Sequence, residues 1–281
     1  MAKRRVPNST ATSSKLRVKA DELKGMADGQ LLLEEKRLFA KAKTGDRQVA
    51  TALFNNLRRC EDAHLDGKLK ESSAMTRTGI DTSRMSAEQW AAYERELNSQ
   101  ARSQMIAQRA QELCKGMGDV GADGSLYWVT LYAANAGDAM AANCLVEGIG
   151  LPNDFTRRPD LVQSYRQNSL RIAQQQISVG NVDMVQILTT YYGGIPGSVS
   201  SYVVPADPEK HYMYLQLLNL IAGIQSPVVL QDRVAAAGAK LDAAAREALD
   251  GKAQRIFDQY FGIHQSVGYP PQGVVCNNAD L

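Results

Sequence analysis

The glycines of one short segment have the spacing of a phosphate-binding loop. Residues 116–121 read Gly-Met-Gly-Asp-Val-Gly, which matches the G-x-G-x-x-G pattern of dinucleotide-binding enzymes. In those enzymes the glycines follow a β-strand and open a helix, whose N-terminus faces the pyrophosphate. Here they follow residues 87–115, whose pattern predicts a helix. We therefore expect Gly116 to end that helix, and we expect no nucleotide and no other cofactor.

Cysteine and histidine are the other residue types whose chemistry has to be considered. The chain has four cysteines and three histidines: Cys60, Cys114, Cys144, Cys276, His64, His211 and His264. None of the cysteines forms a C-x-x-C pair, and no histidine lies at zinc-ligand spacing from them, so we expect no metal site. The sequence also lacks the G-x-S-x-G, H-E-x-x-H, P-loop and EF-hand motifs. We therefore predict no catalytic residue.

Charge is distributed unevenly along the 281 residues, although the net charge is only +2. Residues 1–20 contain six basic side chains and no acidic one, which leaves 26 basic against 30 acidic side chains elsewhere, a net charge of −4. An acidic body is a poor binder of phosphate backbones, so we expect no nucleic-acid partner. The basic segment is either an arm for nucleic acid or an anionic membrane, or a flexible leader, and its polar composition favours the leader. No apolar run is long enough to span a membrane.

Helical patterns dominate the rest of the chain. Residues 31–43 and 47–63 predict two antiparallel helices that are separated by a Gly-Asp break, and the polar residues 64–85 predict a loop. Ser86 and Gln89 form the pattern of a capping box, which predicts a long helix from about Ala87 to about Lys115. The apolar stripe of this helix includes Trp90 and Leu97.

A break of glycine followed by Asp or Asn occurs three times: Gly45-Asp46, Gly137-Asp138 and Gly180-Asn181. A small apolar residue stands four positions after each Asp or Asn, and a leucine stands three positions further on. Glycine suits the left-handed end of one helix, and Asp or Asn caps the next. Breaks that lie 43 residues apart, between 137 and 180, predict one helical hairpin per repeat, as in a solenoid.

Three segments carry a resemblance to a known repeat family. They read AANAGDAMAANCL, VGNVDMVQILTTYYGG and PADPEKHYMYLQLLNLIAG, and they lie within residues 125–225. These segments resemble the Sel-one-like branch of the tetratricopeptide superfamily, in which A-x-x-G-[DN] joins the helices of a hairpin and D-x-x-K-A opens the next. His211 and Val185 depart from the family's small residues at those positions. The resemblance implies roles as adaptors, in bacterial envelope processes or as immunity partners of secreted toxins.

We therefore expect an all-α fold, an α-solenoid of antiparallel helical hairpins built from degenerate repeats. Residues 1–30 form a flexible basic leader in this interpretation, and residues 31–262 form the helical repeat domain, with an insert at 64–118. Residues 242–261 supply a capping helix, and residues 263–281 form a C-terminal tail.

The cysteines bear on the compartment. Cys60 ends the second helix of the first hairpin, and Cys114 ends the long helix that we expect to pack back on it and bury Trp90 and Leu97. We therefore pair Cys60 with Cys114, whereas Cys144 is either joined to Cys276 or a buried thiol. Disulfides favour a periplasmic or secreted location. The alternative is a cytoplasmic protein with reduced thiols. The chain as given lacks a signal-peptide pattern, which favours this alternative.

Stacked hairpins leave a concave surface that suits another protein. We therefore expect a non-enzymatic interaction scaffold, and the alternative is an enzyme without a legible motif. Tyrosines anchor interfaces well because they bury a large area with few rotatable bonds. The tyrosines that we expect to line the partner-binding groove are Tyr132, Tyr165, Tyr191 and Tyr212. The sequence leaves the partner and the oligomeric state open.

Overall fold

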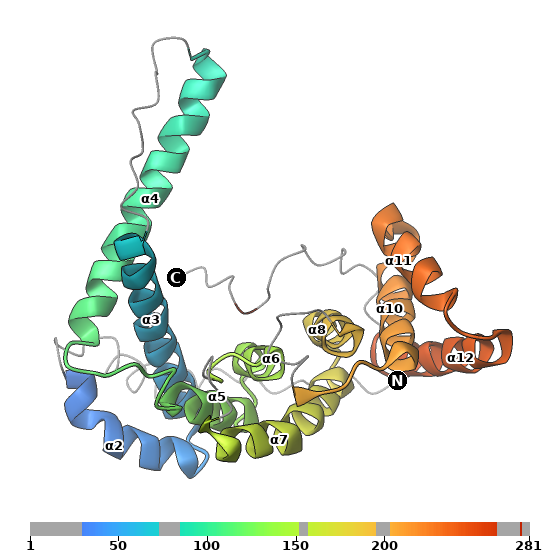
Figure 1. Cartoon of the computed structure of the whole chain (residues 1–281), viewed down its shortest axis with the longest axis horizontal. Coiled ribbons are helices and arrows are strands. Elements are labelled where there is room, and N and C mark those ends of the chain that lie inside the picture. The colour runs from blue at the N-terminus through green and yellow to red at the C-terminus, as the bar shows by residue number, and fades with distance from the viewer. Residues whose placement is uncertain (1–29, 73–84, 152–156, 195–202, 263–275, 277–281) are drawn as a thin grey trace, which may run out of the picture. The chain divides into compact units, whose positions relative to one another are not determined.

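The computed structural model describes residues 30–72, 85–151, 157–194, 203–262 and 276 (Figure 1). Within these ranges every regular element is a helix, so the expectation of an all-α fold is confirmed. The chain divides into two compact units, Met1–Val120 and Gly121–Leu281. The expected leader lies outside the described residues except for Gln30, which begins a helix, and the expected tail lies outside them except for Cys276. None of the described helices combines the length and the apolar character that crossing a membrane requires.

The first unit contains three helices: α2 (Gln30–Lys43), α3 (Arg47–Ser72) and α4 (Ala87–Leu113). Helix α3 packs against both α2 and α4, and its buried side chains include Ala50, Leu53 and Leu57. The expectation of a loop from residue 64 is wrong for residues 64–72, which continue α3. Leu, Lys and Glu dominate the end of this stretch and favour a helix, while Gly67 alone costs only about 1 kcal/mol.

Helix α4 begins with the predicted capping box. The backbone amide of Gln89 donates to Ser86 Oγ at 3.2 Å, and the amide of Ser86 donates to Gln89 Oε1 at 2.9 Å. The helix ends at Leu113, and Gly116 follows with a φ of +83°. The glycine-rich segment therefore follows the C-terminus of a helix, as expected, and lacks the strand that a dinucleotide loop requires.

The second unit contains a longer series of helices: α5 (Ser125–Asn135), α6 (Ala139–Glu147), α7 (Pro159–Ser178), α8 (Val182–Gly193), α10 (Pro208–Ala222), η3 (Gly223–Gln225), α11 (Val228–Gly238) and α12 (Ala243–Tyr260). Helices α5 and α6 pack together, and so do α7 and α8. Helix α5 also contacts α7, and α6 contacts α8. Helix α10 packs against α8, α11 and α12. Helix α11 has no counterpart among the sequence expectations.

The three Gly-Asp or Gly-Asn breaks separate helices as predicted. Each has a left-handed glycine: Gly45, Gly137 and Gly180, with φ of +89°, +88° and +79°. In each, the next side chain accepts a hydrogen bond from the backbone amide three positions later: Asp46, Asp138 and Asn181, at 3.2, 2.9 and 3.2 Å. The residues expected to let the helices pack closely are buried: Ala50, Ala142 and Val185. The same local chemistry therefore builds a hairpin in both units.

Candidate interaction surfaces

The four tyrosines expected in a groove are mostly core residues. Tyr165, Tyr191 and Tyr212 are at most 6% exposed, and Tyr132 is half-buried. The expectation that Tyr165, Tyr191 and Tyr212 line an open groove is therefore wrong. Their rings face neighbouring helices of the same unit and leave almost no surface for a partner.

The hydroxyl groups of these tyrosines join pairs of helices. Tyr165 on α7 donates to the carbonyl oxygen of Val146 on α6 at 2.7 Å. The hydroxyls of Tyr191 on α8 and Ser169 on α7 lie 3.1 Å apart. Burial raises the pKa of Tyr165 well above its ordinary value. These tyrosines therefore stay neutral and fasten the helices, because a buried hydroxyl needs a partner.

The same role extends to the tyrosines near α10. Tyr212 on α10 donates to Asp250 Oδ1 on α12 at 2.8 Å. The rings of Tyr192 and Tyr214 stack with their centroids 5.7 Å apart, and Lys210 Nζ lies 5.0 Å from the centroid of Tyr192. Burial raises the pKa of Tyr192 and Tyr214 to about 12. This cluster therefore belongs to the packing of α8 and α10.

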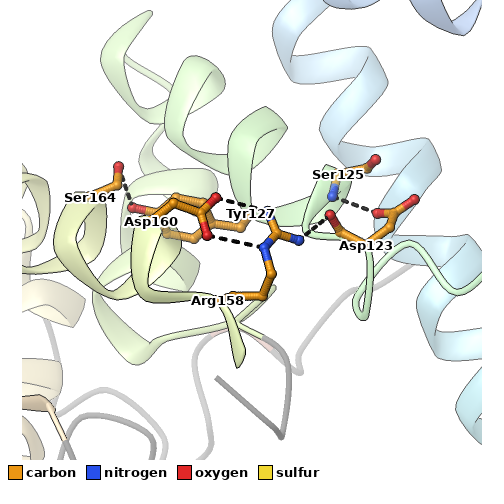
Figure 2. A network of polar contacts seen from close by, with 6 residues as sticks. All are labelled: Asp123, Ser125, Tyr127, Arg158, Asp160 and Ser164. Carbon is orange, nitrogen blue, oxygen red and sulfur yellow. Dashed lines mark hydrogen bonds and ion pairs between the residues drawn. The ribbon is translucent and has the colours of Figure 1, made fainter. Parts of the chain in front are cut away.

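A polar network connects the start of α5 with the start of α7 (Figure 2). Arg158 Nε and Nη2 donate to the two carboxylate oxygens of Asp160 at 3.1 and 2.9 Å. Arg158 Nη1 also donates to the carbonyl oxygen of Asp123 at 2.5 Å, and Asp123 Oδ1 accepts from the amide of Ser125 at 2.7 Å. The hydrogen bonds from Arg158 lower the pKa of Asp160. Asp160 is therefore ionised at neutral pH and serves as the partner of Arg158.

The histidines make separate contacts. His64 Nε2 lies 3.2 Å from Asp119 Oδ2, and His211 Nδ1 lies 2.7 Å from the carbonyl oxygen of Thr189. Burial lowers the pKa of His211, and His264 lies outside the described residues. In the part of the chain that the structure describes, no three His, Cys, Asp or Glu side chains gather in a way that would hold a metal ion.

All four cysteines lie in pairs at disulfide distance. Cys60 and Cys114 have a Cα–Cα separation of 5.6 Å, and Cys144 and Cys276 have one of 5.0 Å. The backbone amide of Cys276 donates to Glu147 Oε2 at 3.2 Å. The first pair is the one that the sequence favours, and the second resolves the choice left open for Cys144 in favour of pairing.

The packing that we expected to bring Cys60 and Cys114 together is nevertheless wrong in one respect. Trp90 is 43% exposed, so α4 does not pack back in a way that buries it. The side chain of Leu97 lies outside the described residues. Ala110, one turn before Cys114, is buried, and this end of α4 packs against α3.

Large apolar side chains are exposed on the second unit where η3 meets α11. Ile224 is fully exposed and Val228 is 72% exposed, and Val229 is also exposed. We call Ile224, Val228 and Val229 the apolar edge. Single exposed apolar residues are common, whereas here three lie within six positions.

The apolar edge is held in place by polar contacts. Ser226 Oγ donates to Asn219 Oδ1 at 2.6 Å, and Gln231 Nε2 donates to the carbonyl oxygen of Ser226 at 3.1 Å. Leu230, the next residue after the edge, is fully buried and anchors α11. Sequence reasoning missed this surface. The sequence feature that could have predicted it is a pair of β-branched residues after a Ser-Pro turn, where only Leu230 continues the core pattern.

Comparison with known proteins adds no relative. No family model, curated protein or solved structure matches the chain.

Proposed function

We propose that the chain is a non-enzymatic interaction scaffold, a solenoid-like stack of helical hairpins that binds another protein through the apolar edge. The observation that carries the proposal is the exposure of Ile224, Val228 and Val229 on a hydrogen-bonded turn. Burying apolar surface against a partner contributes about 25 cal/mol per Å². The edge takes the place of the tyrosine-lined groove, because the tyrosines are used within the core.

Two features of the second unit support this function: hydrogen bonds of Ser226 hold the turn that carries the edge, and the hairpins pack in a regular order. In the second unit α5 contacts α7 and α6 contacts α8, so first helices neighbour first helices and second helices neighbour second helices. This order is the one that repeat stacking produces. Binding then costs less conformational entropy, because the residues of the edge are already positioned.

The proposed location is an oxidising compartment, periplasmic or extracellular. Two cysteine pairs at disulfide distance support it, because disulfides persist in such compartments and thiols stay reduced in the cytosol.

Affinity capture from the native host tests the proposal. We compare the wild-type chain with the double variant Ile224→Glu, Val228→Glu, using Val179→Glu as a control, because Val179 is an equally exposed valine on the turn between α7 and α8. The proposal expects a captured protein that the double variant loses and the control retains. Capture that all three share equally would contradict it. Turnover in a substrate screen that none of these substitutions alters would favour the enzyme alternative.

A further inference from the structure

The two cysteine pairs differ in how much solvent reaches them. Cys144 and Cys276 are both 0% exposed, so solvent does not reach the second pair in the folded chain. Cys60 is 6% exposed, and Cys114 is partly exposed where α4 ends. Exchange between a disulfide and a thiol requires that a thiolate reaches one of the two sulfur atoms. The first pair is therefore the one that a reductant in solution can attack.

The surroundings of the first pair are also open to solvent. His64 follows Cys60 by four residues of α3, at about 40° of rotation, so the two residues share a face of the helix. The side chain of His64 is 41% exposed, and that of its partner Asp119 is 33% exposed. Lys115, which follows Cys114 directly, is exposed as well. Solvent therefore reaches both of the segments that the first pair joins.

The second pair has the opposite surroundings. Residues 141–146, which include Cys144, are all buried in α6. The backbone amide of Cys276 donates to Glu147 Oε2, in the last turn of α6. A thiolate can therefore attack this pair only after the second unit has opened locally, and such an opening costs free energy.

The first pair holds α4 against α3. Of the α4 side chains that the structure describes, Ala110 is the only buried one, and it lies one turn before Cys114. The contact between His64 and Asp119 joins α3 to the segment after α4, but an ion pair this exposed contributes little to stability. Opening the bridge also frees a loop that spans 54 residues, which favours states in which α4 has left α3. We therefore expect α4 to detach more often once the bridge is open.

We propose that the Cys60–Cys114 bridge is a redox-sensitive clasp between α3 and α4, which a small dithiol opens while the Cys144–Cys276 bridge stays closed. A thiolate of the dithiol attacks Cys114 Sγ, the bond between the two cysteines breaks, and Cys60 leaves as a thiolate and takes up a proton. The second thiol of the dithiol then displaces Cys114 from the mixed disulfide. Two electrons and two protons pass from the dithiol to the two cysteines, and the dithiol becomes a disulfide. This inference is independent of the apolar edge.

Partial reduction of the folded full chain tests the order in which the bridges open. The chain is incubated with dithiothreitol, trapped at intervals with an excess of alkylating reagent, and mapped by mass spectrometry. We expect Cys60 and Cys114 to become alkylated at least tenfold faster than Cys144 and Cys276. The same reaction in concentrated urea is the control, because unfolding exposes all four cysteines and should make the rates similar. Equal rates in the folded chain, or a difference of the same size in urea, would overturn the proposal.

Hydrogen exchange tests the consequence for α4. Opening only the first bridge should increase the exchange rates of the amides of residues 105–113 at least tenfold, whereas those of α5 to α8 should change little. The variant Cys60→Ser with Cys114→Ser should show the same change without a reductant. The matched control, Cys144→Ala with Cys276→Ala, should leave the exchange of α4 as in the wild type. Wild-type protection of α4 in both the reduced chain and the first variant would contradict the clasp.

Discussion

The hydroxyl of Tyr127 donates a hydrogen bond of 2.9 Å to Ser164 Oγ, although the two residues are 37 positions apart in the chain. Both residues are buried, Tyr127 on α5 and Ser164 on α7. The contact joins the first helix of one hairpin to the first helix of the next. Packing of one hairpin on the next therefore includes polar contacts as well as apolar ones, here and at Tyr165, whose hydroxyl donates to Val146 on α6. The contact between Tyr191 and Ser169 joins the two helices of one hairpin.

Replacing Tyr127 by Phe should lower the free energy of unfolding by about 1–2 kcal/mol, because the buried hydrogen bond between Tyr127 and Ser164 is lost. Urea denaturation measures the change. The double variant with Ser164→Ala should cost less than the sum of the two single variants, because each single change already breaks the same contact. Strict additivity would show that this hydrogen bond does not couple the two helices.

Stability should fall at alkaline pH. Burial raises the pKa of Tyr127 from 10.0 to about 12, and its hydrogen bond with Ser164 only partly offsets this. In the unfolded chain Tyr127 ionises near pH 10, whereas in the folded chain it stays neutral, so its contribution is complete below pH 10 and lost between pH 10 and 12. The slope is about 1.4 kcal/mol per pH unit for one proton.

Urea denaturation at several pH values between 8 and 12 measures this slope. Tyr127→Phe lacks the titrating group, so its stability should fall less steeply than that of the wild type above pH 10. Identical slopes for the two proteins would contradict the assignment.

Gly124 and Gly137 form a matched pair for a test of backbone and steric effects. Both have a left-handed φ, +82° and +88°. A Cβ at Gly124 would lie 2.8 Å from Leu161 Cδ1 and 2.9 Å from Arg158 Nη1, whereas a Cβ at Gly137 would meet nothing within 4 Å. Gly137→Ala should cost about 1–2 kcal/mol from conformation alone. Gly124→Ala should cost more, because it also displaces Leu161 and the Arg158 network.

Thermal unfolding of the two glycine variants, followed by circular dichroism, compares these costs directly. The expected order is wild type, Gly137→Ala and then Gly124→Ala, from most to least stable. Equal melting temperatures for the two variants would show that the space around Gly124 is not tightly packed.

Non-reduced peptide mapping should recover Cys60 linked to Cys114 and Cys144 linked to Cys276. The first bridge closes a loop of 54 residues, for which chain entropy corresponds to about 4 kcal/mol of stability. Cys60→Ser with Cys114→Ser should therefore unfold at lower urea concentration than the wild type. Recovery of all four as separately alkylated thiols, from protein made in its own host compartment, would contradict the pairing and the proposed location.

Sequence alone predicted the features that depend on neighbouring residues. The break at Gly137-Asp138 and the capping box at Ser86 involve contacts over a few positions, so local residue types determine them. The burial of Tyr165 and the exposure of Trp90 depend on which face another helix covers, and helical periodicity does not contain that information. The apolar edge was missed for the same reason.

The central claim is that the apolar edge contacts a partner protein, and site-specific photocrosslinking in the native host tests it most directly. A photoreactive amino acid replaces Ile224 in one strain and Gln254, an exposed residue of α12, in another. We predict a crosslinked complex of defined mass from position 224 that is absent from position 254 and is lost when Val228→Glu is added. No crosslinked product at position 224, or the same products from both positions, would contradict the account.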